Sequence, residues 1–463
     1  VTMACHGKCY YFPVDKLSTF GEWLAAQETR YTGHDLIDDY YMLMCNYDVS
    51  VMETAFDTAI AQYVLDSARS NYNLAALSNE YLHETIEDEK EFMAANAQID
   101  MFSDGSAAFA DYGLKYCVAV SNLRILQEAR IKAEKLEKLL YEVELPLVEV
   151  MASMEKEGFR TDREFLENFG KELGAEIDRL ADSIHEMAGE DFNINSPQQL
   201  GVILFEKLEL KHGKKTKKGY STSADILKKI KGDHPIIPAI LEYRTLAKLK
   251  STYVDRLIPL INTDGKIHAH FQQTVAATGR LSCTEPNLQN IPIRQELGRQ
   301  LRKAFVPETD DCILTGADYS QIELRVLAHM AEDPALIKAF NDGEDIHRAT
   351  AANVLGISED EITPMERSRA KAVNFGVVYG MSAFGLSDNL DITRKEAEEY
   401  IAAYFQKHEK VREFMDEAVD FAKSEGYALT LMGRKRYIKE IHASNYNVRM
   451  IGERLAMNTP IQG

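Results

Sequence analysis

The stretch from Arg367 to Gly380 decides the fold and reads Arg-Ser-Arg-Ala-Lys-Ala-Val-Asn-Phe-Gly-Val-Val-Tyr-Gly. Just before it, Thr363 and Glu366 have the spacing of a capping box, and Pro364 takes the first helical position. This pattern predicts a helix that begins at Pro364 and runs to Gly380.

Four side chains in the expected helix are spaced by four residues, namely Arg367, Lys371, Phe375 and Tyr379. Each step rises about 6 Å, so the four line one slowly drifting face. The cations lie nearer the N-terminal end, where the helix dipole favours anions, and the aromatic rings lie toward the other end. A triphosphate could lie against the cations while a base stacks on the rings. The spacing fits equally a surface helix with one aromatic edge in the core.

A candidate metal ligand precedes this helix in the chain. The residues from Cys312 to Asp318 read as an apolar strand that ends in a carboxylate, and an apolar repeat at every fourth residue from Ile322 predicts a helix carrying Glu323. Carboxylates at the end of a buried strand suit Mg²⁺, which needs hard oxygen ligands and open positions for substrate phosphates. A lone Asp at a strand end is more often a turn or cap residue, and that alternative stays open here.

Two polar clusters lie on either side of these elements. The loop Thr278 to Ser282, followed by Pro286 to Asn290, is rich in donors and contains Arg280, whose guanidinium can fork two hydrogen bonds to a phosphate or a base edge. Near the end of the chain, a stripe of three polar donors is spaced by four: Arg454, Asn458 and Gln462. Taken alone, the first cluster is simply a loop, and polar stripes are usually solvated faces.

The chain length limits the number of domains, and the charge distribution allows nucleic acid as a partner. A chain of 463 residues is too long for one core, so two to four domains are expected. The net charge of −20 argues superficially against nucleic acid, but binding depends on where the cations sit. Between Lys207 and Lys231 there are nine lysines against two acidic residues. This run is either a solvated loop or a site of sequence-independent phosphate contact.

The first part of the chain, residues 1 to about 130, alternates strand-like and helical runs. Cys9 to Phe12 predicts a strand and Tyr40 to Asn46 a helix, which is α/β patterning. The first residues, from Val1, read like the inside of a strand, so we expect the chain to start mid-domain.

From about residue 131 to 262 the patterning is strongly helical. Leu136 to Glu157 predicts an amphipathic helix that stops at Gly158, and Thr161 with Glu164 predicts a capping box for the next one. Further helices are expected to start at Ser196-Pro197 and at Thr222 or Ser223.

After the helical region the sequence predicts one strand and then mostly helices. Lys266 to Thr274 reads as a strand, and residues 333 to 450 as nearly all helical. No apolar run approaches the ~20 residues of a membrane span, and no signal peptide is visible. Six scattered cysteines fit reduced thiols. We therefore expect a cytoplasmic protein without a membrane partner.

Several of these stretches resemble the motifs of family A DNA polymerases, the bacterial DNA polymerase I group. Asp318 to Arg325 (Asp-Tyr-Ser-Gln-Ile-Glu-Leu-Arg) resembles motif A of that family, and Arg367 to Gly380 resembles motif B, its fingers helix. The loop around Arg280, the Asp345-Ile-His347 stretch and the residues from Glu453 to Gly463 follow in the family order. The resemblance covers roughly residue 136 onward.

The resemblance implies an α+β multidomain chain, truncated at both ends, with a right-hand polymerase preceded by an α/β ribonuclease-H-like domain of the 3′–5′ exonuclease type. The implied divisions are a degenerate exonuclease-like domain at 1–130, a thumb at 131–262, the first part of the palm at 263–335, fingers at 336–450 and the start of a returning palm helix at 451–463. The motif B helix would occupy 364–380.

The resemblance also implies a set of site residues, each at a matching position in this sequence. The catalytic residues would be Asp318, Lys371 and Arg367, with Asp318 and the Tyr319 carbonyl binding two Mg²⁺ ions. The nucleotide-binding residues would be Tyr319, Gln321, Glu323, His347, Arg367, Lys371, Phe375 and Tyr379. The DNA-binding residues would be Arg280, Asn287, Asn290, Lys214, Lys215, Lys217, Lys218, Arg454, Asn458 and Gln462.

Individual roles follow from the same resemblance. Arg367, Lys371 and His347 would hold the triphosphate. Glu323 would exclude a ribose 2′-OH, the group that separates RNA from DNA precursors. Phe375, as phenylalanine rather than tyrosine, implies discrimination against dideoxynucleotides.

The sequence departs from the family pattern at two places. The chain stops at Gly463, before the hairpin that carries the family's second metal-binding Asp. We expect the segment alone to bind nucleotide poorly and not to polymerise, the remaining palm being supplied by a continuation of the chain or by a second polypeptide. In the exonuclease-like domain, the stretch ending at Asp39 sits where one catalytic Asp would fall, but the Tyr-x-x-x-Asp motif expected between Tyr112 and Cys117 is missing. We expect proofreading to be lost.

The function that these observations imply is extension of a DNA primer along a DNA template in replication or repair, by a monomer that uses dNTPs and two Mg²⁺ ions. The alternatives are a 3′–5′ nuclease, whose activity would depend on Asp39, and a catalytically inert DNA-binding fragment. A related single-subunit RNA polymerase is disfavoured by Glu323 and Phe375.

Overall fold

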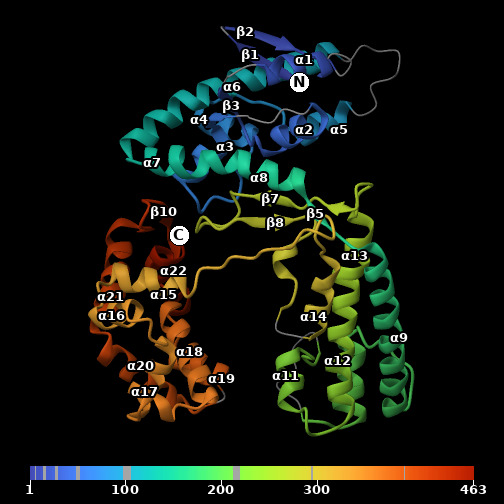
Figure 1. Cartoon of the computed structure of the whole chain (residues 1–463), viewed down its shortest axis with the longest axis vertical. Helices are drawn as coiled ribbons and strands as arrows, with labels where there is room; N and C mark the ends of the chain where they lie inside the picture. The colour runs from blue at the N-terminus through green and yellow to red at the C-terminus, as the bar shows by residue number, and fades with distance from the viewer. Residues whose placement is uncertain are drawn as a thin grey trace. The chain divides into compact units, whose positions relative to one another are not determined.

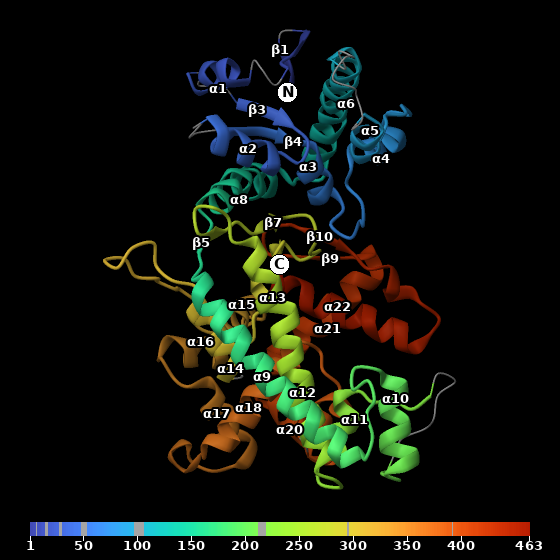
Figure 2. The ribbon, with the colours of Figure 1, turned by 90° about the vertical axis from the view of Figure 1, so that its right-hand side faces the viewer.

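The computed structural model describes residues 1–5, 7–13, 17–26, 30–47, 53–96, 106–211, 219–293, 296–390 and 392–463. The chain divides into two compact units, shown in Figures 1 and 2. The first unit comprises Val1–Ser153, Gln272–Ser282 and Gly316–Gly463, and the second comprises Met154–Phe271 and Cys283–Thr315. Each unit is described by itself.

The N-terminal part of the first unit has α/β character. Its elements are β1 (Thr2–Cys5), β2 (Lys8–Tyr11), α1 (Leu17–Ala25), β3 (Arg30–Gly33), α2 (Ile37–Tyr47), β4 (Glu53–Asp57), α3 (Thr58–Leu65), α4 (Leu74–Tyr81), α5 (Glu89–Asn96), α6 (Ser106–Ala133), α7 (Glu137–Leu139), a π-helical turn (Leu140–Glu144) and α8 (Leu145–Glu157). β1 and β2 pair antiparallel, whereas β3 and β4 pair in parallel across the crossover helix α2. A parallel pair needs such a crossover.

The later part of the first unit is mostly helical. Its elements are α15 (Ile322–Met330), α16 (Pro334–Asn341), α17 (Ile346–Leu355), a 3₁₀ turn (Glu359–Glu361), α18 (Pro364–Val378), α19 (Ala383–Leu390), α20 (Arg394–Lys407), α21 (Glu409–Glu425), β9 (Tyr427–Leu429), β10 (Lys435–Tyr437), a 3₁₀ turn (Lys439–His442) and α22 (Tyr446–Gln462). β9 and β10 form an antiparallel hairpin. The core joins α15, α18, α20 and α21 through buried residues such as Leu324, Val373, Tyr404 and Met415.

The second unit is built on long helices, of which α9 and α12 run side by side in both ribbon views (Figures 1 and 2). Its elements are β5 (Phe159–Arg160), α9 (Arg163–Ala188), α10 (Pro197–Val202), a π turn (Ile203–Lys207), α11 (Ala224–Lys229), α12 (Ile236–Leu249), a π turn (Lys250–Val254), α13 (Asp255–Leu257), a 3₁₀ turn (Ile258–Leu260), β6 (Lys266–Ile267), a 3₁₀ turn (Leu288–Asn290), α14 (Glu296–Leu301) and a 3₁₀ turn (Arg302–Ala304). β7 (His270–Gln272) and β8 (Ser282–Thr284) pair where the chain passes between units.

Most of the helices expected from the sequence are present. α2, α15 and α18 confirm three of them, and the expected helix at Leu136–Glu157 forms with a π-helical turn inside it, ending before Gly158 in the left-handed region (φ 62°). Helix α18 ends at Val378, so the expected end at Gly380 is two residues too late. Gly380 has φ 60°, a conformation that favours glycine.

Three local predictions are wrong. Helix α9 is capped by Asp162, whose carboxylate accepts from Phe165 N at 2.9 Å, and not by Thr161, because Asp162 lies directly before the first helical turn. The expected strand Lys266–Thr274 is broken into β6 and β7.

The third wrong prediction is the strand from Cys312 to Asp318. These residues are irregular and exposed, with Ile313 83% exposed. A strand needs a neighbour for its backbone hydrogen bonds, and none of the described residues pairs with this segment. An apolar pattern alone therefore does not make it a strand.

The division into five parts, with boundaries after residues 130, 262, 335 and 450, stays a prediction. Among the described residues, no helix is both long and apolar enough to cross a membrane.

Candidate nucleotide site

Helix α18 is held at its N-terminus by the capping box expected from the sequence. Thr363 N donates to the Glu366 carboxylate at 2.8 Å, and Glu366 N donates to Thr363 Oγ1 at 3.3 Å. Ala370, Val373 and Val377 are buried on the inner side of the helix. The packing fixes which face of the helix points away from the core.

The outer face carries the cations expected from the spacing. Arg367 Nε donates to Asp345 Oδ2 at 2.6 Å, while Asp345 Oδ1 caps α17 by accepting from the amides of His347 and Arg348. Burial acts to raise the pKa of Asp345, but the hydrogen bonds from Arg367 and from the Arg348 amide outweigh it and hold that pKa below its usual value. Lys371 is exposed one turn further along. Asp345 thus orients one of the two cations.

His347 lies behind this face and is only 2% exposed. Its Nδ1 lies 3.0 Å from Asn374 Nδ2, and its ring centroid lies 5.9 Å from that of Phe375. Burial lowers the pKa of His347, and the charge of Arg367 lowers it further. Both effects disfavour the protonated form of His347, whose ring lies beside that of Phe375. Direct contact of His347 with a phosphate stays a prediction. Asn374 is not among the predicted site residues, because an asparagine inside a predicted helix gives no sequence signal of a buried partner.

Glu323, in the first turn of α15, joins residues from distant parts of the chain. Its Oε1 accepts from Arg280 Nη2 at 2.7 Å, and its Oε2 accepts from Tyr379 OH at 2.7 Å. Burial raises the pKa of Tyr379, as does its hydrogen bond to Glu323. The structure thus brings Arg280, Glu323 and Tyr379 together, although the first and last of them are 99 positions apart in the sequence (379 − 280).

The polar stripe of α22 lies against the end of α18. Asn458 Nδ2 donates to the Tyr379 carbonyl at 3.4 Å. A Cβ on Gly380 would meet Met457 Cε at 2.7 Å and Arg454 Cγ at 3.2 Å, so glycine lets the two helices approach. Gln321, which precedes α15, adopts φ 54°. Gln462 is the last residue of α22.

The expected metal ligands are not assembled into a site. Asp318 and Tyr319 lie in the exposed irregular segment, and Tyr319 is 80% exposed. Within either unit, the described residues hold no group of three side chains able to ligate one metal ion. A single carboxylate does not fit a two-metal site, which needs ligands on both sides of the pair.

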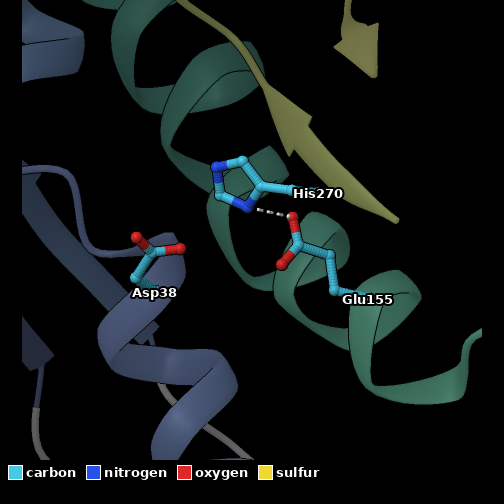
Figure 3. Close-up of side chains that lie close together, drawn as sticks. All are labelled: Asp38, Glu155 and His270. Carbon is cyan, nitrogen blue, oxygen red and sulfur yellow. Dashed lines mark ion pairs between the residues drawn. The ribbon is translucent and has the colours of Figure 1, made fainter. Parts of the chain in front are cut away.

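A buried carboxylate in the last turn of α8, the part of this helix that belongs to the second unit, has a structural partner. Glu155 pairs with His270 Nδ1 at 3.1 Å and accepts from Phe271 N at 2.5 Å (Figure 3). Asp38, also labelled in that figure, belongs to the first unit. The pair anchors β7 to α8.

The remaining DNA-binding expectations fall on the second unit or outside the described residues. Asn287 and Asn290 are exposed around the 3₁₀ turn at Leu288–Asn290. Lys214, Lys215, Lys217 and Lys218 lie outside the described residues.

The sequence reasoning missed a buried ion pair between Arg434 and Glu144, which are 5% and 3% exposed. Gln273 Nε2 donates to Glu144 Oε2 at 2.8 Å. The partners lie 290 residues apart, so no local pattern could have shown this pair.

Comparison with known proteins identifies the class of this chain. Residues 163–463 match the model of DNA polymerase family A, and the chain belongs to that family. It is a homologue of bacterial DNA polymerase I. DNA polymerase I of Geobacillus stearothermophilus is 45% identical over 416 residues, which cover 90% of this chain and 47% of the relative. DNA polymerase I of Bacillus subtilis (strain 168) is 43% identical over 459 residues, 98% of this chain and 52% of the relative.

A solved structure shows the same fold. The POL domain of Pol1 from M. smegmatis, in complex with DNA primer-template and dNTP, is 35% identical, with a TM-score of 0.83 over 97% of this chain and 76% of that one. The chain is therefore a mostly helical polymerase domain. It spans about half the length of the curated relatives that it matches.

Proposed function

We propose that this protein extends a DNA primer along a DNA template by adding deoxynucleotides to the primer 3′ end. The observation that carries the proposal is the outer face of α18, where Arg367 and Lys371 precede Phe375, beside a Glu323 held by Arg280 and Tyr379. The similarity to a polymerase structure that contains primer-template and dNTP supports it.

The proposed division of labour follows the chemistry of each side chain. Arg367 and Lys371 hold the triphosphate, because both are cationic and lie toward the N-terminal half of α18, where the helix dipole also favours anions. Phe375 packs against the incoming sugar and base, and Glu323 excludes a 2′-OH. Arg280, Asn458, Arg454 and Gln462 contact primer and template.

The proposal assigns metal binding to Asp318. Polymerases of this kind use two Mg²⁺ ions to bridge and neutralise the reacting phosphate oxygens. Asp318 would hold them, but it needs a second carboxylate from elsewhere.

The test is templated incorporation by the complete gene product that carries this chain. With primer-template DNA, Mg²⁺ and one dNTP at a time, we expect extension only with the nucleotide complementary to the template. Extension without template, or binding of DNA with no extension under any dNTP, would contradict the proposal. The second outcome would favour the inert DNA-binding alternative.

We propose further that the exonuclease-like part has lost proofreading. Tyr116 stands where an Asp would close the expected motif, and its hydroxyl donates to the His34 carbonyl at 3.2 Å. Its ring also contacts the His34 ring edge-on. An aromatic side chain offers no carboxylate to a metal.

The corresponding test uses a primer with a mismatched 3′ end, Mg²⁺ and no dNTP. We expect no shortening of the primer by the unaltered protein. Shortening that disappears in Asp39→Ala would establish the nuclease alternative instead.

A further inference from the structure

The loop that carries Arg280 is held in place by residues of the N-terminal part of the first unit. We call residues 273–281 the Arg280 loop. Tyr63, in α3, is fully buried and donates its hydroxyl to the Ala276 carbonyl at 2.6 Å. Ser67, just after α3, lies with its hydroxyl 3.0 Å from the carbonyl oxygens of both Ala277 and Lys435. Two consecutive peptide groups of the loop are therefore fixed from α3.

Gly279 of the Arg280 loop packs against the buried guanidinium of Arg434. Gly279 has φ 90°, and a Cβ there would lie 2.9–3.1 Å from Nη2, Nε and Cζ of Arg434. The Arg434 guanidinium also lies 5.1 Å from the centroid of the Tyr63 ring. The loop backbone thus rests on Arg434, and only glycine leaves room for that contact.

The start of the loop is tied to the same network. Gln273 Nε2 donates to the Glu144 carbonyl at 2.9 Å and to Glu144 Oε2 at 2.8 Å. Glu144 is the last residue of the π-helical turn that precedes α8, and its other oxygen pairs with Arg434. π-helical turns occur frequently at functional sites. Both ends of the loop therefore converge on one buried ion pair.

We propose that Tyr63 and Ser67 are positioning residues that hold Arg280 against Glu323 and thereby shape the polymerase site from the exonuclease-like part of the chain. The inference rests on the proposed polymerase function. The two hydroxyls bond to backbone carbonyls and not to the side chains of Arg280, Glu323 or Tyr379. These hydroxyls fix the backbone that carries Arg280, whose side chain is more than half exposed and pairs with Glu323. The N-terminal part thus has a role in synthesis that needs no nuclease chemistry.

A double-mutant cycle tests the proposal with the complete gene product. Tyr63→Phe and Ser67→Ala each remove one hydroxyl group and leave the rest of the side chain unchanged, and the combined variant removes both hydroxyls. We expect each single variant to lower kcat/KM for extension of a matched primer by up to about fivefold, since a lost hydrogen bond corresponds to roughly this factor, and the combined variant to lower it further. In an Arg280→Ala background the same two changes should have almost no effect, because the group that they position is gone.

Two matched substitutions control for loss of a buried hydroxyl. Ser78 in α4 and Tyr404 in α20 are buried, and their hydroxyls have no partner among the described residues. Ser78→Ala and Tyr404→Phe should leave extension unchanged. Thermal unfolding and the two single variants separate a local effect from a general loss of fold.

The outcomes distinguish the inference from the function on which it rests. An equal fall in both the Arg280 and the Arg280→Ala backgrounds would overturn the positioning role, as would no fall in either. A protein that extends no primer before any substitution would overturn the proposed function and this inference together.

Discussion

Helix α18 and residues 312–319 carry the two halves of the proposed chemistry, and they are held in place by different means. Helix α18 closes its hydrogen bonds within itself, and Thr363 and Glu366 cap its first turn. Residues 312–319 belong to no helix or strand and are exposed along their length. The side chains that would meet the nucleotide are therefore positioned locally, whereas Asp318 depends on a partner for its backbone. The proposed nucleotide-binding face of α18 thus forms without support from the proposed metal-binding segment.

The largest effect is expected from removing the Asp318 carboxylate in residues 312–319. If Asp318 holds the metal ions once its segment is paired, Asp318→Asn should lower incorporation by about 10³-fold, since a metal ligand acts directly on the reacting phosphates. Single-turnover incorporation rates measure this. Asp311→Asn, an exposed neighbour in the same stretch, is the matched control and should leave the rate unchanged.

Glu323 links the two regions, because it follows the irregular segment and is held by Tyr379 at the end of α18. If it excludes the 2′-OH by its bulk, Glu323→Ala should raise ribonucleotide incorporation relative to deoxynucleotide by about 10²-fold, roughly the effect of relieving a steric clash of a few kcal/mol. Glu323→Gln keeps the bulk but loses the charge that pairs with Arg280. Equal discrimination by Gln and Glu would support the steric role, and equal discrimination by Ala and Glu would contradict it.

The self-sufficiency of α18 can be tested at its cap. Thr363→Ala removes the side chain that accepts from Glu366 N and should cost about 1 kcal/mol of local stability. Hydrogen exchange of the first-turn amides of α18 would report it as faster exchange. Ser223→Ala is the control, because Ser223 occupies the N-cap of α11 without a side-chain cap hydrogen bond. Unchanged exchange in Thr363→Ala would show that tertiary packing alone holds the helix.

The smallest expected effect is on the pH dependence of folding stability, through His347. Burial and the charge of Arg367 hold the pKa of His347 below its unfolded value of 6.5. The unfolded chain therefore binds more protons than the folded one as the pH falls through 6.5, so stability decreases toward acid pH. His347→Gln should make the unfolding temperature less sensitive to pH between 7.5 and about 5.5. A steeper dependence in the variant would show that protonated His347 stabilises the fold.

The parts of the molecule that the sequence predicts well are those whose structure is set by neighbours in the chain. The cap at Thr363, the proline at 364 and the four-residue spacing of α18 are local, and the helix follows them closely. The strand expected at Cys312–Asp318 fails because a strand is completed by residues far away in sequence. The cap at Thr161 fails for a smaller reason, namely that Asp162 offers a better-placed acceptor one residue later.

In the candidate site, too, the sequence indicated individual residues through local motifs but not the contacts between distant residues. Glu323, Tyr379 and Arg280 each came from a motif, but nothing in their spacing showed that one carboxylate would join the other two. The Arg434–Glu144 pair and the hydroxyls of Tyr63 and Ser67 left no sequence signal, since each acts on a backbone or a charge hundreds of residues away. Long-range polar contacts to backbone are the part that only a structure supplies.

The central claim is that the outer face of α18 binds the incoming triphosphate. The most direct measurement compares incorporation kinetics of Lys371→Met with those of Lys395→Met, an exposed lysine of α20 that pairs with Glu399. We predict that Lys371→Met lowers kcat/KM for the dNTP by about 10²-fold, as expected for removal of a cation that neutralises the reacting phosphates, and that Lys395→Met changes nothing. Equal kinetics for the two variants would contradict the account.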